Sequence, residues 1–247
     1  MTMTSSAAHT ITTGSRDGGR GDDDRRDVGT TAGGSRGRVL AGFPPPPEQA
    51  RAQVADGPVA DPGGEPVLVW AVSAHGGAGA TSLAARVGFI GDAGGRFPSG
   101  AYPGEDRVVI CAAETVAGLE AAQNLALQHL NGLGGETRLL AVVTHPVHPG
   151  WTGAKTPVEI RGMLDLLDDP GVPWRLIRLG FDSELALTAP DQVQQVTPGE
   201  VAEWMRMDAK ARRRAGRSRD SLAASGVVAA AADLVGLAAD PPDPSPD

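Results

Sequence analysis

Cysteine, lysine and long apolar runs are scarce in this 247-residue sequence, and each scarcity excludes something. The single cysteine, Cys111, rules out an intramolecular disulfide, and its apolar neighbours predict a small core residue rather than a nucleophile. No apolar run approaches the roughly 20 residues that a membrane-spanning helix needs. The first residues also lack the apolar centre of a signal peptide. We therefore expect a soluble, cytoplasmic protein without a membrane span.

Composition predicts one folded region between two unstructured ends. Hydrophobic residues make up 40% of the chain, enough for one core, whereas glycine and proline gather toward the ends. Residues 1–66 have no apolar period, so we expect a disordered N-terminal region there, and the proline-rich residues 240–247 predict a disordered tail. Between them we expect an α/β domain over residues 67–190 and a helical C-terminal extension over residues 191–239.

Four apolar runs predict the strands of the α/β domain. Three are apolar throughout, which is typical of parallel strands covered on both faces, and the fourth alternates more and therefore predicts an edge position. We expect a short, doubly wound, mostly parallel sheet with flanking helices and right-handed crossovers. The predicted strands are Val67–Val72, Val108–Ala112, Leu139–Thr144 and Trp174–Leu179.

Five helical patterns alternate with these strands or follow them. Thr156 with Glu159, and Thr197 with Glu200, have the spacing of capping boxes and predict two helix starts. Between the first helix and the second strand, Gly91–Gly104 predicts a turn-rich connection with no strand that ends in an aspartate. The predicted helices are about Thr81–Ile90, Val116–Leu130, Thr156–Leu167, Thr197–Arg214 and Ser221–Ala239.

A glycine-rich loop between the first strand and the first helix is the main candidate site. Successive backbone N–H groups in such a loop, with a helix start behind them, form a concave site for an anion. The competing interpretation is a tight turn that only packs the helix against the strand. The candidate binding residues are Gly76, Gly77, Ala78, Gly79, Ala80, Thr81 and Ser82.

This loop resembles the nucleotide-binding loop of the ParA/MinD-type partition and cell-division ATPases, whose pattern is GKGGxGKT. Residues 74–81 (AHGGAGAT) align with it and retain the three central glycines and the hydroxyl residue, Thr81. The resemblance implies a truncated P-loop NTPase-like fold, Mg-ATP as the cofactor and Thr81 as the Mg²⁺ ligand. The chain is also similar to an uncharacterised family of actinobacterial proteins, often linked to mobile elements, that share the AHGGAG loop.

Two departures from the family pattern predict a degenerate Walker A loop that has lost hydrolysis. Ala80 replaces the lysine that contacts the β- and γ-phosphates, and His75 replaces the lysine that acts across a dimer. Removing the phosphate lysine removes a charge that stabilises the transferred group. The segment from Val108 to Leu125 resembles the family's strand and helix that follow its hydrolytic aspartate, which implies that the aspartate strand is missing. We therefore predict no catalytic residue.

The resemblance implies a regulatory or adaptor module in plasmid, chromosome or mobile-element maintenance, with a protein partner or a second copy of the chain. One alternative is an active ATPase that uses Arg86, His75 or Lys155 as its cation. A second is a nucleic-acid-associated module, since six basic residues within ten positions can contact phosphates. These are Lys210, Arg212, Arg213, Arg214, Arg217 and Arg219.

Two histidines after the third strand raise the question of a metal. His145 and His148 are three residues apart, but they lie in a proline-containing loop and no second pair has ligand spacing, so we predict no specific metal site. In the ParA/MinD pattern an asparagine at this point contacts adenine. Thr144 or His145 stands there in this chain, which implies that base recognition differs.

Overall fold

The computed structural model describes residues 43–59, 66–185, 187–189, 192–216 and 225–240. All of them belong to one compact unit, Ser35–Asp247. Of the disorder predicted for residues 1–66 and 240–247, the parts over residues 1–42, 60–65 and 241–247 fall outside the described residues. Among the helices that the structure describes, none has the length and hydrophobicity to cross a membrane.

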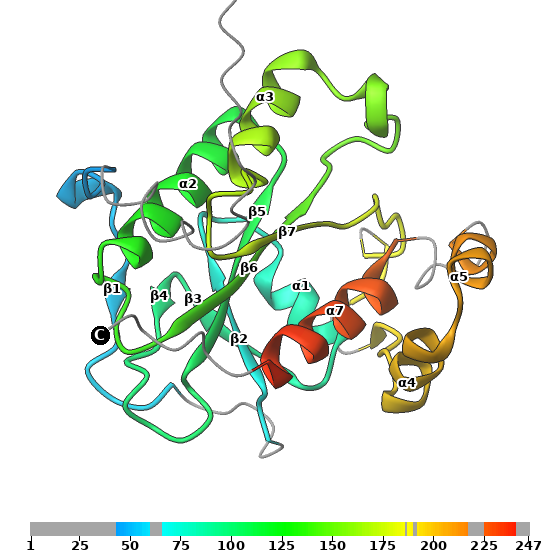
Figure 1. The fold of residues 1–247 in the computed structure, drawn as a ribbon, viewed down its shortest axis with the longest axis horizontal. Helices are drawn as coiled ribbons and strands as arrows, with labels where there is room; N and C mark the ends of the chain where they lie inside the picture. Colours follow the sequence, from blue (N-terminus) through cyan, green and yellow to red (C-terminus); the bar gives the residue numbers. More distant parts are fainter. Residues whose placement is uncertain (1–42, 60–65, 186, 190–191, 217–224, 241–247) are drawn as a thin grey trace, which may run out of the picture. The chain divides into compact units, whose positions relative to one another are not determined.

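Five parallel strands form the central sheet in the order β3-β2-β5-β6-β7 (Figure 1). The chain enters at β2, adds β3 on one side, and then returns to the other side of β2 to add β5, β6 and β7. The strand order therefore reverses between β2 and β5, and in doubly wound sheets ligands bind at the carboxyl ends of the strands at this point. The strands are β2 Val69–Ser73, β3 Ile90–Gly94, β5 Arg107–Ala113, β6 Arg138–His145 and β7 Arg175–Arg178.

Helices cover both faces of this sheet, as the sequence predicts. Successive side chains of β2 alternate between the faces: Val69 and Ala71 pack in one core, and Trp70 and Val72 in the other. This alternation explains why the strands are apolar throughout. The first core contains side chains of α1 (Ala80–Arg86), α4 (Pro198–Arg206) and α7 (Val227–Ala239), and the second contains side chains of α2 (Val116–Leu130) and α3 (Val158–Leu167).

The four predicted strands are all present, and β7 lies at an edge as predicted. The prediction for residues 90–94 is wrong, because they form the edge strand β3 instead of a turn-rich connection. Its sequence, IGDAG, contains two glycines and has weak strand propensity. Backbone pairing with β2 overrides that propensity, since Val69 pairs with Ile90 and Ala71 with Asp92. The first helix accordingly ends at Arg86 rather than near Ile90.

The N-terminal disorder prediction is wrong for residues 43–59, which we call the N-terminal strap. The strap contains η1 (Glu48–Ala50) and β1 (Gln53–Val54), and β1 pairs in parallel with β4 (Arg96–Phe97). The buried Gln128 of α2 holds its backbone, because the side-chain amide both donates to the carbonyl of Ala52 and accepts from its N–H, each at 2.8 Å. These contacts order a segment whose composition alone favours disorder.

The two predicted capping boxes have different outcomes. Thr197 caps α4 as predicted: its Oγ1 accepts from the Glu200 N–H at 3.2 Å, and the Glu200 carboxylate accepts from the Thr197 N–H at 2.7 Å. The box predicted at Thr156 is wrong, because α3 begins one residue later with Pro157 at its N-cap. The buried hydroxyl of Thr156 finds no partner among the described residues.

The helix predicted over Thr197–Arg214 is two helices. Helix α4 ends at Arg206, and α5 (Ala209–Ala215) starts afresh after it. The side chain of Asp208 accepts from the N–H groups of Lys210 and Ala211 at 2.8 and 2.7 Å and so caps the second helix. Asp competes for backbone donors in this way, which favours a new helix start over continuation. The last helix, α7, agrees with the prediction from Val227 onward.

Candidate functional site

The glycine loop after β2 has a backbone conformation that glycine adopts more easily than other residues. Gly77 and Gly79 have φ values of 81° and 88°, in the left-handed region that residues with a Cβ rarely occupy. Helix α1 follows directly, with Gly79 at its N-cap. Of the seven candidate residues, Gly76, Gly77 and Thr81 are exposed, Gly79 and Ser82 are half-buried, and Ala78 and Ala80 are buried.

Thr81 contacts an aspartate that sequence reasoning missed. Its Oγ1 donates to Oδ2 of Asp92 at 2.5 Å, and Oδ1 of Asp92 accepts from the Gly94 N–H at 2.8 Å. No apolar strand ending in an aspartate stands here, as expected, but the strand β3, which the sequence did not predict, carries Asp92 to the loop beside β2. The signal was hidden because Asp92 sits in a short glycine-rich segment without the usual apolar run.

His75 lies between the carboxyl ends of β2 and β5, where the strand order reverses. Its Nε2 lies 3.2 Å from the backbone nitrogen of Ala113 at the end of β5, and its Nδ1 lies 2.8 Å from the carbonyl oxygen of Gly76. Nε2 therefore accepts from the Ala113 N–H, which assigns the ring hydrogen to Nδ1. A Cβ on Gly118 of α2 would lie 2.7 Å from Nε2, so this glycine leaves the space that the imidazole occupies.

A cavity of about 650 Å³ lies on the Asp92 side of the loop, and we call it the aspartate-side cavity. The strap contributes Arg51, the loop contributes Gly76 and Thr81, and α2 contributes Asn124. A second cavity of about 620 Å³ shares Arg51 and Asp92 with it and adds Arg96. Ligand sites commonly have volumes of several hundred cubic ångströms with a few convergent polar groups.

A smaller cavity of about 330 Å³ lies on the other side of the loop, with apolar walls that include Pro146, Phe181 and Leu185. We call it the histidine-side cavity, because His145 lines it and packs its ring on Gly79. A Cβ on Gly79 would lie 3.0 and 3.1 Å from two atoms of that ring. The Nε2 of His145 is buried and has no partner among the described residues. His145, the last residue of β6, thus borders this cavity.

The two histidines considered for a metal do not converge. His148 accepts from the Gly150 N–H through Nδ1 at 2.9 Å and packs against Trp151, whereas His145 packs on the loop. Within the described residues, no group of three or more His, Cys, Asp or Glu side chains is placed to hold a metal ion.

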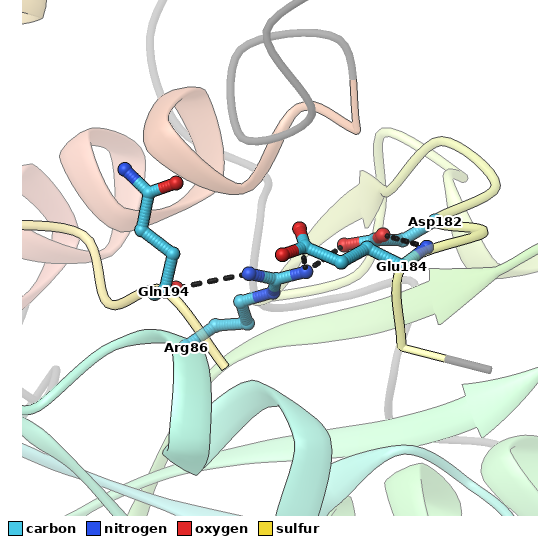
Figure 2. A network of polar contacts seen from close by, with 4 residues as sticks. All are labelled: Arg86, Asp182, Glu184 and Gln194. Carbon is cyan, nitrogen blue, oxygen red and sulfur yellow. Dashed lines mark hydrogen bonds and ion pairs between the residues drawn. The ribbon is translucent and has the colours of Figure 1, made fainter. Parts of the chain in front are cut away.

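Arg86 of α1 is buried and bound to the chain that follows β7 (Figure 2). Its Nη2 contacts Asp182 at 2.8 Å and Glu184 at 2.9 Å, and its Nη1 donates to the carbonyl of Gln194 at 3.0 Å. Asp182 also lines the histidine-side cavity. The guanidinium therefore fastens one wall of this cavity to α1, and both of its terminal nitrogens are already committed.

A second acid that sequence reasoning missed is buried and joins the carboxyl ends of three strands. Glu114, fully buried after β5, accepts from Arg178 of β7 at 2.8 and 2.7 Å and from Thr144 of β6 at 3.1 Å. The hydrogen bond to Glu114 raises the pKa of Arg178. The residues are far apart in sequence, so only the parallel sheet brings them together.

The basic cluster lies only partly within the described residues. Lys210, Arg213 and Arg214 are exposed on α5, whereas Arg217 and Arg219 fall outside the described chain. Arg212 is used within the fold: its Nε and Nη2 donate to the carbonyls of Trp204 and Met205, each at 3.1 Å. It therefore satisfies carbonyl groups at the end of α4.

We compared the chain with known protein families, curated proteins and solved structures. No protein-family model, curated protein or solved structure matches the chain.

Proposed function

We propose that this chain is a non-hydrolysing, P-loop-like module that binds a nucleotide or another phosphate weakly at Gly76–Ser82. It acts as a cytoplasmic regulator or adaptor. The observation that carries the proposal is the Thr81–Asp92 pair at the mouth of the glycine loop. This pair sets a hydroxyl and a carboxylate beside backbone that favours an anion, at the carboxyl ends of two neighbouring parallel strands.

The oxygen atoms of Thr81 and Asp92 suit magnesium. Mg²⁺ prefers oxygen ligands and is usually held by one or two protein groups, with phosphate and water completing its shell. A site with only two protein ligands therefore fits a magnesium–phosphate complex better than a free metal ion. Bound Mg²⁺ would neutralise phosphate charge, Thr81 and Asp92 would hold it, and the loop backbone would face the phosphate oxygens.

We attribute the loss of hydrolysis to the glycine loop itself, which carries no charged side chain where the ParA/MinD pattern has a lysine. Ala80 carries no charge and is 1% exposed. His75 is bound to Ala113, and the terminal nitrogens of Arg86 are bound to Asp182, Glu184 and Gln194. Lys155 lines neither cavity beside the loop. These contacts support the proposed loss of hydrolysis over the alternative of an active ATPase that uses one of these three residues as its cation.

A protein partner, or a second copy of the chain, completes the proposal, with a role in plasmid, chromosome or mobile-element maintenance. The nucleic-acid alternative is favoured by three neighbouring exposed cations on α5, namely Lys210, Arg213 and Arg214. Its test is DNA binding at two salt concentrations. Binding that weakens steeply with salt, and that disappears when these residues become glutamine, would support it.

Isothermal titration calorimetry of the full chain with ATP, ADP and GTP tests the main proposal, with Mg²⁺ or with EDTA. We expect magnesium-dependent binding, a clear loss in Thr81→Ala, and retention in Thr81→Ser, which keeps the hydroxyl. Phosphate release should stay at the level of buffer. Absence of any binding by the natural protein would contradict binding at the loop, and magnesium-dependent turnover would contradict the loss of hydrolysis.

A further inference from the structure

The aspartate-side cavity has one wall that the glycine loop does not provide. The N-terminal strap forms this wall, and residues 49–52 of the strap line the cavity. The strap is held at several points: β1 pairs with β4, Gln128 holds both backbone groups of Ala52, and the buried Glu105 accepts from the Val59 N–H at 2.6 Å. These contacts hold the strap in place, so its residues 49–52 form a fixed wall of the aspartate-side cavity.

Arg51 is the cation that the strap brings to the loop. It is half-buried, lines both cavities beside Asp92, and precedes Ala52, the residue that Gln128 clamps. Its Nε donates to the carbonyl of Pro46 at 2.8 Å, which holds the side chain while both terminal nitrogens remain without a partner among the described residues. Arg51 also forms no ion pair within that part of the chain.

The charges around the cavity define the ligand that fits it. Asp92 repels a bare anion but attracts a cation, and the free fork of an arginine matches two oxygens of a phosphate group. The neighbouring cavity adds a second arginine, the exposed Arg96. In a magnesium-bound chain of two or more phosphates, the Mg²⁺ pairs with Asp92 and the phosphate oxygens pair with the arginines. A single phosphate without Mg²⁺ would be repelled by Asp92.

We propose that Arg51, on the N-terminal strap, supplies positive charge that binds a magnesium-bound polyphosphate at the glycine loop, where Ala80 provides none. This inference rests on the proposed function and identifies Arg51 as the residue whose charge allows phosphate to bind at the glycine loop. Gln128 is a positioning residue for Arg51, because it clamps the adjacent backbone from α2.

Calorimetry with magnesium pyrophosphate and Mg-ATP tests this on the full chain. Arg51→Gln should weaken binding of both probes about tenfold or more, as expected for a charge-assisted hydrogen bond to phosphate. Arg51→Lys should restore part of the affinity, because it keeps the charge but loses the fork. The matched control is Arg175→Gln, which removes the same charge from an exposed position on β7 at the opposite edge, and it should bind like the natural protein.

A double-mutant comparison tests the positioning role of Gln128. Gln128→Leu removes both hydrogen bonds to Ala52, so it should weaken pyrophosphate binding. Adding Arg51→Gln to this variant should then reduce the affinity by less than Arg51→Gln reduces it in the natural protein. Full additivity of the two losses would overturn this role. Thermal unfolding of each variant verifies that the fold is intact.

The outcomes separate this inference from the proposed function. Equal binding by the natural protein and Arg51→Gln overturns the role of Arg51 and leaves the proposed function standing. Pyrophosphate binding that depends on Arg51, with nucleotides binding no better than pyrophosphate, supports Arg51 and overturns nucleotide recognition. No binding of either probe by the natural protein overturns both.

Discussion

Thr81 in the first turn of α1 donates its hydroxyl hydrogen to the carboxylate of Asp92 in β3, over 2.5 Å. Thr81 lies in α1 and Asp92 in β3, only 11 residues further along the chain, because α1 is short and β3 returns immediately beside β2. The hydrogen bond makes the glycine loop and the edge strand a single unit.

Asp92→Asn should remove the magnesium dependence of phosphate binding. The amide can still accept from Thr81, but it loses the charge that attracts Mg²⁺. Pyrophosphate affinity measured with Mg²⁺ should therefore fall to the level measured with EDTA. Asp165→Asn, at an exposed position on α3, is the control. An unchanged magnesium effect in Asp92→Asn would contradict a role for this carboxylate.

His75→Leu should destabilise the fold more than His75→Gln. Leucine leaves the Ala113 N–H without its acceptor, and an unsatisfied buried donor costs about 1–3 kcal/mol. Glutamine offers an oxygen acceptor and should recover part of that loss. The free energy of unfolding from urea titration measures the difference. Similar losses in both variants would show that Nε2 of His75 does not stabilise the end of β5.

Arg86→Met should cost about 3–5 kcal/mol of unfolding free energy, because it leaves the buried carboxylate of Asp182 without its partner. Arg86→Lys keeps the charge but not the fork and should cost less. An exposed arginine of α3 provides the control, and Arg161→Met should change stability by less than about 0.5 kcal/mol. Chemical denaturation compares the four proteins. A loss in Arg86→Met no larger than in the control would contradict a structural role for the ion pair.

His129 should make the fold less stable in mild acid. Burial lowers the pKa of its imidazole below the usual 6.5, although the hydrogen bond to the Thr137 carbonyl opposes this shift. The unfolded chain therefore binds a proton more readily than the folded one. The stability from this group is complete above pH 6.5 and is lost as the pH falls through the lowered folded value.

His129→Gln provides the comparison, because glutamine can donate to the Thr137 carbonyl but does not titrate. Its unfolding free energy should change less between neutral pH and mild acid than that of the natural protein. The other histidines are common to both proteins, so the difference belongs to His129. Parallel pH profiles would contradict the prediction.

Cys111 should resist thiol reagents until the protein unfolds. Burial raises the pKa of its thiol to about 12, with a smaller contribution from the charge of Asp92. Because the thiolate is the reactive form, the folded protein should not react with a disulfide reagent at neutral pH, and the denatured protein should react with one equivalent. Rapid labelling of the folded protein would show that β5 opens readily.

Local patterns were sufficient for most of the framework. Strands β5 and β6 are long apolar runs, α2 has a clear helical period, and Thr197 with Glu200 forms the predicted cap. Such signals depend on neighbouring residues, so a single sequence carries them. The misplaced cap at Thr156 shows their limit, because the chain direction at α3 leaves the threonine hydroxyl buried instead of at the helix end.

The sequence by itself determined the α/β class and the glycine loop with its uncharged Ala80, since each depends on residue types at close spacing. Only the tertiary structure decided which groups surround that loop. Asp92 arrives on a strand too rich in glycine to predict, and Arg51 arrives on a strap held by backbone pairing and by Gln128, 76 residues from Ala52. Long-range pairing outweighs local propensity there, because backbone hydrogen bonds across a sheet depend on position and not on side-chain pattern.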